Sequence, residues 1–294
     1  MRYSQKKAMN YYHICTEGTK DRVLFRDNDD YISTMNYIAI TCIEHNIILL
    51  AFCIMSNHLH FIVLSEYVAA KRFIISVKRR CSLKHWHKYN EHHLFSKDKH
   101  PVSIIEINDV DYLKSAIAYV LRNPYKGMGE LIWNYPWSSI EAYFNGSMIK
   151  PIFKNNLHDN SIRRNTRLLH SNYRIGIPSI TIGNHGFIPP KEYVAYQRVE
   201  SIYATSKAMM YFLNKDNDNE MDIKLTSKRN RMTMSDSKIL GMLPSILNAN
   251  YGVKSLDELD IRQRLAMVGI LQRMFNSSPK QIARILQISP QILI

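Results

Sequence analysis

Apolar and polar positions repeat with two different periods along the first half of the chain, and these periods predict both helices and strands. Apolar residues recur near helical spacing over 27–45, which predicts a helix. A nearly unbroken apolar run over 47–54 is typical of a buried strand, and 58–64 is predicted to be the next strand. The short Ser56-Asn57 segment between these two runs predicts a tight hairpin turn.

The same patterns extend over the rest of the first 150 residues. The other elements expected there are a strand at 11–16, a basic helix at 68–90, a strand at 102–107 and a helix at 108–123. The order β-α-β-β-α-β followed by another helix predicts an α+β fold, a ferredoxin-like antiparallel sheet of the split β-α-β kind with packed helices. In the last helix, Asn108 is the expected N-cap, and Pro124 is expected to make Asn123 the final residue.

The pattern changes after about residue 150, where an irregular stretch gives way to an all-α C-terminal region. The expected divisions are a catalytic domain at 1–150, an irregular and helical extension at 151–213, a linker at 214–230 and a helical domain at 231–294. Residues 281–289 are similar to the first helix and turn of a helix-turn-helix. We therefore expect either a small DNA-binding bundle or a plain stabilising helical element.

Composition narrows the class of protein. The net charge of +14 favours a polyanionic partner, although a merely soluble basic protein has the same property. The 18 tyrosines among Lys and Arg suit stacking on unpaired bases. The four cysteines show no paired spacing, and no apolar segment resembles a signal peptide or membrane span. A cytoplasmic protein with reduced thiols is expected.

Two histidines carry the first candidate chemistry. Strand alternation places His58 and His60 on one face, where two neutral imidazoles make half of a divalent-metal site. On its own this pattern is more often a pair of structural histidines. Farther along, Tyr119 and Asn123 stand one helical turn apart, and they offer a phenol nucleophile beside a carbonyl ligand. By pattern alone, Tyr119 is more often a core or boundary residue.

An ordered set of motifs connects these residues to a family. The motifs are Tyr12-His13-Ile14, Leu24-Phe25-Arg26-Asp27, Cys53 to His60, His93-Leu94-Phe95, Tyr119 to Pro124, and Tyr135-Pro136-Trp137-Ser138-Ser139. With them the chain resembles the single-tyrosine transposases of the His-hydrophobe-His class, namely the IS200-like group and its relatives associated with repetitive extragenic palindromes. It departs from the family at Glu17-Gly18-Thr19, where the family has Arg-Gly-Asn, and at Ser96 to His100.

The resemblance implies a role for each matching residue. His58 and His60 would be metal ligands, Asn123 the third ligand and Tyr119 the nucleophile. The implied reaction cleaves and rejoins single-stranded DNA at hairpin-bearing, palindromic ends through a 5′-phosphotyrosine, with Mg²⁺ or Mn²⁺ as the cofactor. The long C-terminal extension is closer to the palindrome-associated branch, which implies a monomer, with a homodimer as the alternative. No general base for Tyr119 is identified.

Basic and aromatic residues supply the candidate DNA contacts. They are Lys78, Arg79, Arg80 and Lys84 on the basic helix, Arg122 and Lys126 beside the proposed site, and Trp137. The alternatives are a solvated helix face and a core tryptophan. Two other functions also fit the motifs, namely a domesticated, non-cleaving DNA-binding regulator and a nicking enzyme of plasmid or phage replication.

Overall fold

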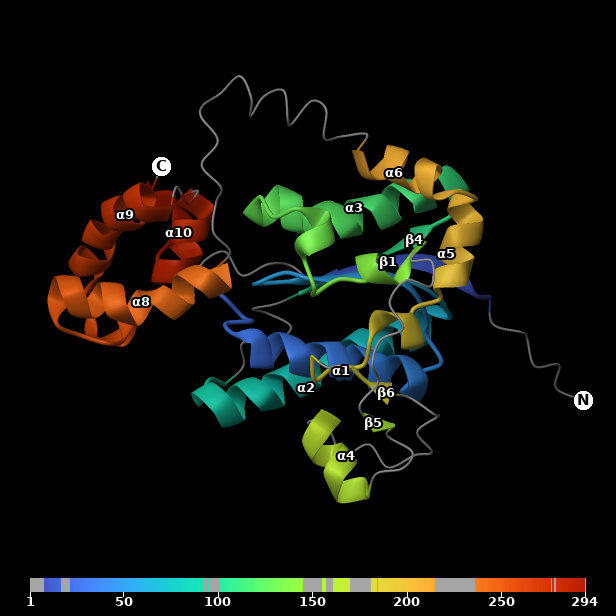
Figure 1. Cartoon of the computed structure of the whole chain (residues 1–294), viewed down its shortest axis with the longest axis horizontal. Helices are drawn as coiled ribbons and strands as arrows, with labels where there is room; N and C mark the ends of the chain where they lie inside the picture. The colour runs from blue at the N-terminus through green and yellow to red at the C-terminus, as the bar shows by residue number, and fades with distance from the viewer. Residues whose placement is uncertain are drawn as a thin grey trace, which may run out of the picture.

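The computed structural model describes residues 8–16, 22–92, 95, 101–144, 155–156, 161–169, 181–183, 185–214, 236–275, 277 and 279–293. The predictions made for Glu17-Gly18-Thr19, His93-Leu94, Ser96 to His100 and all but the first residue of the linker at 214–230 lie outside these residues. The described part is an α+β fold with one four-stranded antiparallel sheet, followed by a helical bundle (Figure 1). The α+β class and the helical C-terminal region are therefore confirmed.

The sheet has the strand order β2-β3-β1-β4. β1 spans Asn10–Thr16, β2 Ile48–Ile54, β3 Leu59–Ser65 and β4 Val102–Ile107. β2 and β3 form the expected hairpin, in which Ile54 pairs with Leu59 and the Met55 amide donates to the His58 carbonyl at 2.9 Å. All seven residues of β3 are buried. A mostly apolar sequence suits this strand because helices cover both faces of the sheet.

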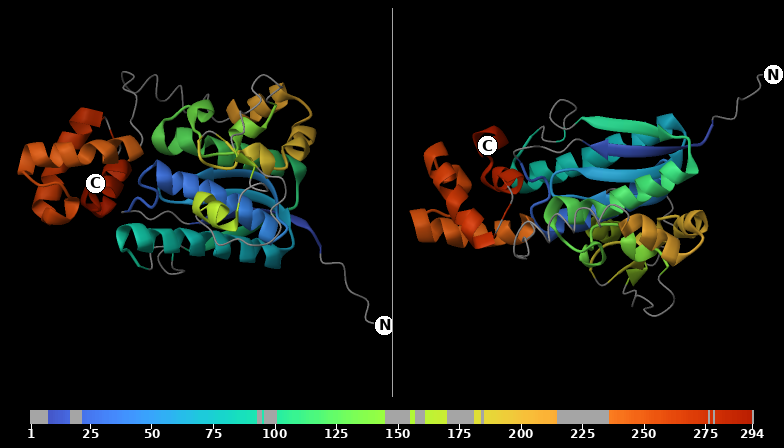
Figure 2. Two further views of the ribbon diagram at one scale, coloured as in Figure 1. Left: turned by 60° about the horizontal axis from the view of Figure 1, so that its bottom comes forward. Right: turned by 90° about the horizontal axis from the view of Figure 1, so that it is seen from above.

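The helices lie in two layers around the sheet. α1 (Asn28–Glu44) and α2 (Tyr67–Tyr89) cover one face, and α3 (Val110–Met128) covers the other (Figures 1 and 2). The alternation of β3 follows the same division: the Phe61 ring lies 5.1 Å from that of Phe73 on α2. The ring of the preceding residue, His60, lies 5.7 Å from that of Tyr119 on α3. Successive strand residues thus reach opposite helix layers.

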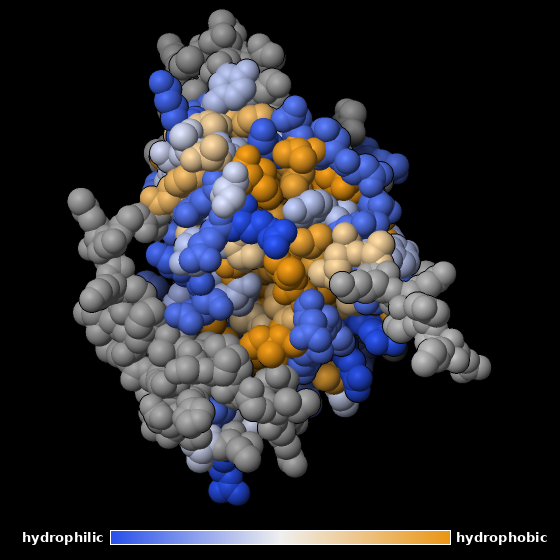
Figure 3. All heavy atoms as spheres, turned by 90° about the vertical axis from the view of Figure 1, so that its right-hand side faces the viewer, coloured by the Kyte–Doolittle hydropathy of each residue, from blue (hydrophilic) through white to orange (hydrophobic). Residues whose placement is uncertain are grey.

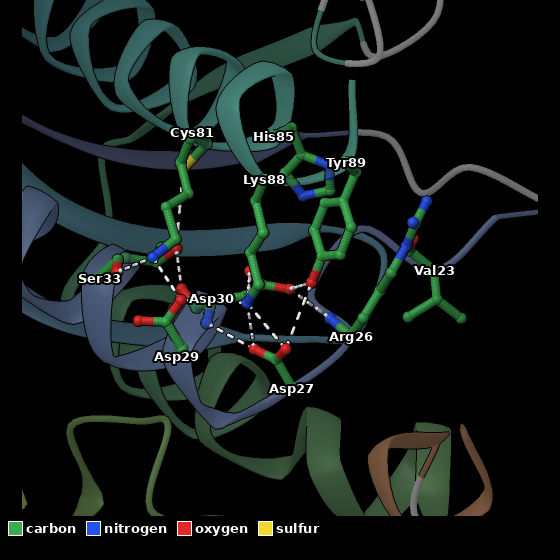
Figure 4. Close-up of polar contacts among 12 residues, drawn as sticks. Val23, Arg26, Asp27, Asp29, Asp30, Ser33, Cys81, His85, Lys88 and Tyr89 are labelled. Atoms are coloured by element: carbon green, nitrogen blue, oxygen red, sulfur yellow. Dashed lines mark hydrogen bonds and ion pairs between the residues drawn. The ribbon is translucent and has the colours of Figure 1, made fainter. Parts of the chain in front are cut away.

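A network of ion pairs joins the start of α1 to the end of α2 (Figure 4). Asp27 caps α1 by accepting from the Asp30 amide. The Lys88 ammonium lies 2.6 Å from a carboxylate oxygen of Asp27 and 2.9 Å from one of Asp30, and the Tyr89 hydroxyl donates to Asp30 at 2.7 Å. Lys84 binds Asp29 in the same network. Acidic residues at a helix N-terminus also interact favourably with the positive end of the helix dipole.

α3 begins two residues later than expected and ends five residues later. Its N-cap is Asp109, whose carboxylate accepts from the Tyr112 amide at 2.6 Å, so the prediction of Asn108 is wrong. The buried stripe of the helix agrees with the sequence pattern and consists of Leu113, Ile117, Val120 and Leu121.

The helix continues through Pro124, so the expected end at Asn123 is also wrong. Pro124 has no N–H to donate to the Val120 carbonyl. The Asn123 side-chain amide replaces that donor, at 3.3 Å from the Val120 oxygen and 3.0 Å from the Tyr119 oxygen. A side-chain donor one residue before the proline thereby keeps the helix intact.

The extension packs around the sheet domain. Its described elements are β5 (Asn155–Asn156), α4 (Ile162–Leu169), β6 (Thr181–Ile182), α5 (Tyr196–Tyr203) and α6 (Ser206–Asn214). The apolar pattern from about Glu192 to Leu213 predicts one helical stretch, but Ala204, at a φ of 63°, separates α5 from α6. The Tyr203 hydroxyl fastens α5 to α3 by donating to the Lys114 carbonyl at 2.6 Å. From the side on which α5 lies, apolar surface is visible between polar residues (Figure 3).

The C-terminal bundle has its own apolar core. It consists of α8 (Asp236–Tyr251), α9 (Ile261–Phe275), α10 (Pro279–Leu286) and two short 3₁₀ turns, Leu256–Glu258 and Pro290–Leu293. The bundle meets the sheet domain at Asp236, which is 1% exposed and accepts from the Ser56 hydroxyl at 2.5 Å. Gln281 and Arg284 of α10 bind the same carboxylate at 2.9 and 3.2 Å. Within the described part of the chain, no helix has the length and apolar character that a membrane crossing requires.

Candidate active site

Strand pairing brings a second pair of chemically reactive side chains beside His60. In the β1–β3 ladder, Cys15 lies directly opposite His60, and His13 lies opposite Ile62. Directly paired residues and residues two positions apart share one face of a sheet. His13, Cys15 and His60 therefore all lie on the face that α3 covers.

The imidazole rings of His58 and His60 are in contact. Their centroids are 4.7 Å apart and their planes are inclined by 80°. His58 Nδ1 lies 2.8 Å from the Asn57 side-chain oxygen, which can only accept. Nδ1 of His58 therefore carries the proton, and its Nε2 keeps a lone pair for another partner.

Burial keeps these imidazoles neutral. It lowers the pKa of His58 to about 4, and the nearby positive charge of Arg284 acts in the same direction. Burial lowers the pKa of His60 well below the ordinary value, with further contributions from His58 and His13. His60 is 3% exposed. Both rings are uncharged at neutral pH, which is the form that binds a metal ion.

Tyr119 projects from α3 onto the imidazoles. Its ring centroid lies 5.7 Å from that of His60 and 5.9 Å from that of His13, edge-on in both contacts. The side chain is 39% exposed, so a substrate can reach the phenol. Burial raises the pKa of this phenol, Cys15 raises it further, and the positive charge of Arg122 lowers it. The phenol is therefore protonated at neutral pH, and Arg122 favours the phenolate.

Asn123 lies one turn beyond Tyr119 and is 8% exposed. Its amide nitrogen is committed to the two α3 carbonyls described above. That orientation leaves the side-chain oxygen as the acceptor a metal would need. The two imidazoles and the phenol are thus brought together by ring contacts, whereas Asn123 follows on the same helix.

The candidate DNA contacts on the basic helix lie across the sheet from Tyr119. Lys78 is 8% exposed, Arg80 pairs with Glu44 at 2.6 Å, and Lys84 belongs to the ion-pair network between α1 and α2. Arg79 is exposed. Because α2 packs on α1 and not on α3, we do not assign the scissile strand to this helix.

The remaining candidates divide between the site and the core. Arg122 is buried beside Tyr119, and the side chain of Lys126 lies outside the described residues. Trp137 stacks on Tyr31 with ring centroids 4.9 Å apart, which is a packing role. Trp137 also borders a cleft of about 940 Å³ between α1 and the bundle. The charged side chains lining that cleft are mostly acidic, and this disfavours a phosphate backbone there.

A different cluster satisfies a purely geometric test for a metal site. Asp27, Asp29 and Asp30 are the only described group of His, Cys, Asp or Glu with three ligand atoms within 4.8 Å of one another. Their carboxylates already bind Lys84 and Lys88 (Figure 4), so the cluster has a structural explanation. His58 and His60 belong to no such group among the residues that the structure describes.

Sequence reasoning singled out neither His13 nor Cys15 as a site residue. Their two-residue spacing on β1 places them on one face, but the periodicity of a strand does not reveal its neighbour. Only the β1–β3 register, which joins Cys15 to His60, shows that they share a face with the candidate site residue His60. Comparisons of the chain with family models, with curated proteins and with solved structures found no match.

Proposed function

We propose that this protein is a metal-assisted transposase that cleaves and rejoins single-stranded DNA through Tyr119. The observation that carries the proposal is the edge-on contact of the Tyr119 ring with His60, at 5.7 Å, beside a second neutral imidazole, His58. Tyr119 comes from a helix, and His58 and His60 come from a hairpin far from it in the sequence. Their contact supports cleavage by a phenol nucleophile beside a metal ion. A phenol is a weak nucleophile and needs such surroundings.

The fold supports the same proposal. We infer a split β-α-β, ferredoxin-like sheet, which the element order β-α-β-β-α-β and the strand order β2-β3-β1-β4 support. In this arrangement β1 and β3 are central, and they carry the histidines on one face. α3 then covers that face and supplies the tyrosine. The family resemblance of the sequence motifs leads to the same assignment of roles.

The donor set fits a divalent metal. His58 and His60 would hold it through neutral nitrogens, and the Asn123 oxygen has the chemistry of a further ligand. Mixed nitrogen and oxygen ligands suit Mn²⁺, and Mg²⁺ is the alternative. When bound, the ion supplies Lewis-acid activation of the scissile phosphate. Uncharged ligands leave its positive charge undiminished.

The chain's own residues account for the covalent step. The Tyr119 oxygen attacks the phosphorus, a P–O bond to tyrosine forms, and the bond to the 3′ oxygen breaks. The phenol proton leaves to a base or to solvent, and the departing 3′ oxygen gains a proton to become a hydroxyl. The Arg122 charge favours the phenolate that this step requires. Attack of a 3′ hydroxyl on the phosphotyrosine reverses the sequence and rejoins the strand.

A labelled oligonucleotide tests the proposal. Hairpin-bearing single strands incubated with the protein and Mn²⁺ should yield a protein–DNA adduct that resists denaturation. The adduct should vanish with a chelator, in Tyr119→Phe and in His60→Ala. Tyr112 provides a matched control on the same side of α3, since it is 49% exposed and has no described ring contact with the imidazoles, so Tyr112→Phe should form the adduct normally.

The same assay separates the competing functions. Tight hairpin binding without an adduct in Mg²⁺ or Mn²⁺ would contradict the proposal and favour a non-cleaving regulator. An adduct that persists in Tyr119→Phe would place the nucleophile elsewhere. An adduct formed at a single nick in a replication origin, with no joining to a second end, would favour the replication-type nicking enzyme.

A further inference from the structure

His13 makes a specific contact with the imidazole that we assign to the metal. Its Nε2 lies 3.3 Å from Nδ1 of His60, and the two rings are stacked at 5.5 Å with their planes inclined by only 19°. The contact links neighbouring strands, β1 and β3, through residues 47 positions apart. An imidazole nitrogen facing another imidazole nitrogen at this distance makes a hydrogen bond only if exactly one of them carries the proton, since two lone pairs or two protons would repel.

The other nitrogen of His60 faces a different environment. Nε2 of His60 is 3.9 Å from the sulfur of Cys15, and the His60 ring meets the Tyr119 ring edge-on. The proton of a neutral imidazole resides on one nitrogen and leaves a lone pair on the other. Which nitrogen of His60 can hold a metal is therefore decided by the partner of Nδ1, and that partner is His13.

We propose that His13 is a positioning residue: its Nε2 accepts the Nδ1 proton of His60 and thereby keeps the Nε2 lone pair of His60 directed at the metal. The inference rests on the proposed function, because it concerns the same centre. Outer partners of this kind normally fix the tautomer and orientation of a metal-bound histidine, most often as a carboxylate or a backbone carbonyl. A neutral imidazole does the same without adding a negative charge.

Two further observations agree with this role. Burial lowers the pKa of His13 to about 4, so its ring is neutral and able to accept. His58 is held in the same way, since its Nδ1 donates to Asn57 at 2.8 Å and leaves Nε2 available. Both proposed ligands therefore present the same nitrogen. The edge-on contact of His13 with Tyr119, at 5.9 Å, places the positioning residue against the nucleophile as well.

The tautomer of His60 can be observed without any metal. In the full-length protein labelled with ¹⁵N-histidine, long-range ¹H–¹⁵N spectra distinguish the Nδ1–H from the Nε2–H form. We expect the signal that disappears in His60→Ala to be the Nδ1–H form. An Nε2–H form of His60 in the wild-type protein would overturn the inference, and this measurement requires no variant at position 13.

Substitution at position 13 tests the consequence for metal affinity. His13→Phe keeps a stacked ring but removes the acceptor, and should raise the Kd for Mn²⁺, measured by titration calorimetry or electron paramagnetic resonance, by about 10–100-fold. His13→Gln offers an amide oxygen as a replacement acceptor and should restore most of the affinity. His45 is the matched control, since its Nε2 has a partner, Ser76, 2.8 Å away on α2, so His45→Phe should leave the Kd unchanged.

The outcomes separate this inference from the proposed function. Normal Mn²⁺ affinity in His13→Phe, together with loss of affinity in His60→Ala, would overturn the inference and leave the proposed function standing. A wild-type protein that binds no Mn²⁺ would overturn both. Equal weakening in His13→Phe and His13→Gln would also count against the inference, because it would indicate a packing role without a specific acceptor.

Discussion

Burial determines the protonation state of the histidines near Tyr119. His58 and His13 lose water when the hairpin and β1 pack under α3, and the loss lowers the pKa of each to about 4. A free imidazole would be partly charged near pH 6 and would have to release a proton before binding a cation. In the folded protein His58 and His13 have already lost this proton, because burial favours the neutral imidazole. Burial thus keeps both imidazoles in the neutral form that the proposed metal site requires.

The clearest pH effect on stability belongs to Glu91, remote from these histidines. Burial opposes its ionisation, but the contact with His85, whose Nδ1 lies 3.7 Å from a Glu91 oxygen, and the hydrogen bonds from Arg26 outweigh that effect and lower the pKa from 4.5 to about 2. A depressed pKa stabilises the fold above pH 4.5, and this stabilisation is lost as the pH falls towards 2.

The variant Glu91→Gln should therefore have a lower free energy of unfolding than the wild-type protein at pH 7, by about 1–2 kcal/mol after allowance for partial exposure. Urea denaturation at several pH values should show the difference shrinking below pH 4.5. Asp111→Asn is the control, since Asp111 is 82% exposed. A difference that stays constant down to pH 2.5 would contradict the account.

At this scale the sequence identified some site residues and missed others for a physical reason. Alternation within one strand is visible in a sequence, so His58 and His60 were assigned to one face. Tyr119 and Asn123 were paired by the helical repeat, which is equally local. The contact of His13 with His60 depends on which strands become neighbours, and a local pattern carries no information about that choice.

At the scale of elements, α3 presents the proposed nucleophile, Tyr119, from its third turn and continues past a proline. Its N-terminal cap, Asp109, fixes where the helix begins. The buried stripe of Leu113, Ile117 and Leu121 then fixes its rotation about its axis and so the direction in which Tyr119 points. The proline downstream costs one backbone hydrogen bond, which Asn123 offsets.

A double-mutant cycle tests this compensation in α3. Asn123→Ala removes the donor that serves the Val120 carbonyl and should cost about 1 kcal/mol of unfolding free energy. In a Pro124→Ala background the backbone N–H returns, so the same substitution should cost less, with a coupling energy of about 0.5–1 kcal/mol. Thermal or urea denaturation of the four proteins provides the measurement. Strict additivity would show that the two features act independently.

The basic helix α2 shows where sequence reasoning about an element reaches its limit. Its cluster of Lys and Arg was compatible with a solvated face or with phosphate contacts. The structure pairs Lys84 and Lys88 with the acidic first turn of α1, and Lys78 is buried. The partner carboxylates are more than fifty residues away, and a charge count along one helix does not reveal them. Pro124 misled the prediction similarly, because the local rule ignored the side chain that replaces the missing donor.

At the scale of the whole molecule, the C-terminal bundle is fastened to the sheet domain next to the site. Asp236 is the central residue, because it accepts from Ser56 in the β2–β3 turn and binds Arg284 and Gln281 of α10. His58 follows that turn directly, and the charge of Arg284 acts on it. The turn that precedes His58 thus belongs to the sheet domain and is bound by the C-terminal bundle.

Removing this carboxylate should loosen the bundle. Asp236→Ala leaves the largely buried Arg284 without its counter-charge, and such a loss typically costs about 3–5 kcal/mol. Hydrogen exchange should become faster in α8, α10 and the 54–58 turn, and the free energy of unfolding should fall. Asp257 offers the control, since it is 87% exposed and Asp257→Ala should have little effect. Unchanged exchange in all three segments would contradict the described interface.

The fold class could be predicted from the sequence better than the contacts between residues that are far apart in it. Strand and helix periods gave the α+β class and the β2–β3 hairpin, because both depend on neighbouring residues. The hydrogen bond between Ser56 and Asp236 joins residues 180 positions apart, and no local sequence pattern predicts it. The division of 192–213 into two helices at Ala204 was also missed, since a positive φ in alanine has no signature in sequence.

Peptide mapping determines whether the Tyr119 oxygen becomes covalently joined to DNA, as the proposed function requires. Trypsin cleavage after Lys114 and Arg122 releases residues 115–122, whose only tyrosine is Tyr119. After reaction with hairpin DNA and Mn²⁺, followed by nuclease and trypsin digestion, mass spectrometry should find a 5′-linked nucleotide on this peptide, at Tyr119. A nucleotide on any other residue, or cleaved DNA with no modified peptide, would contradict the account.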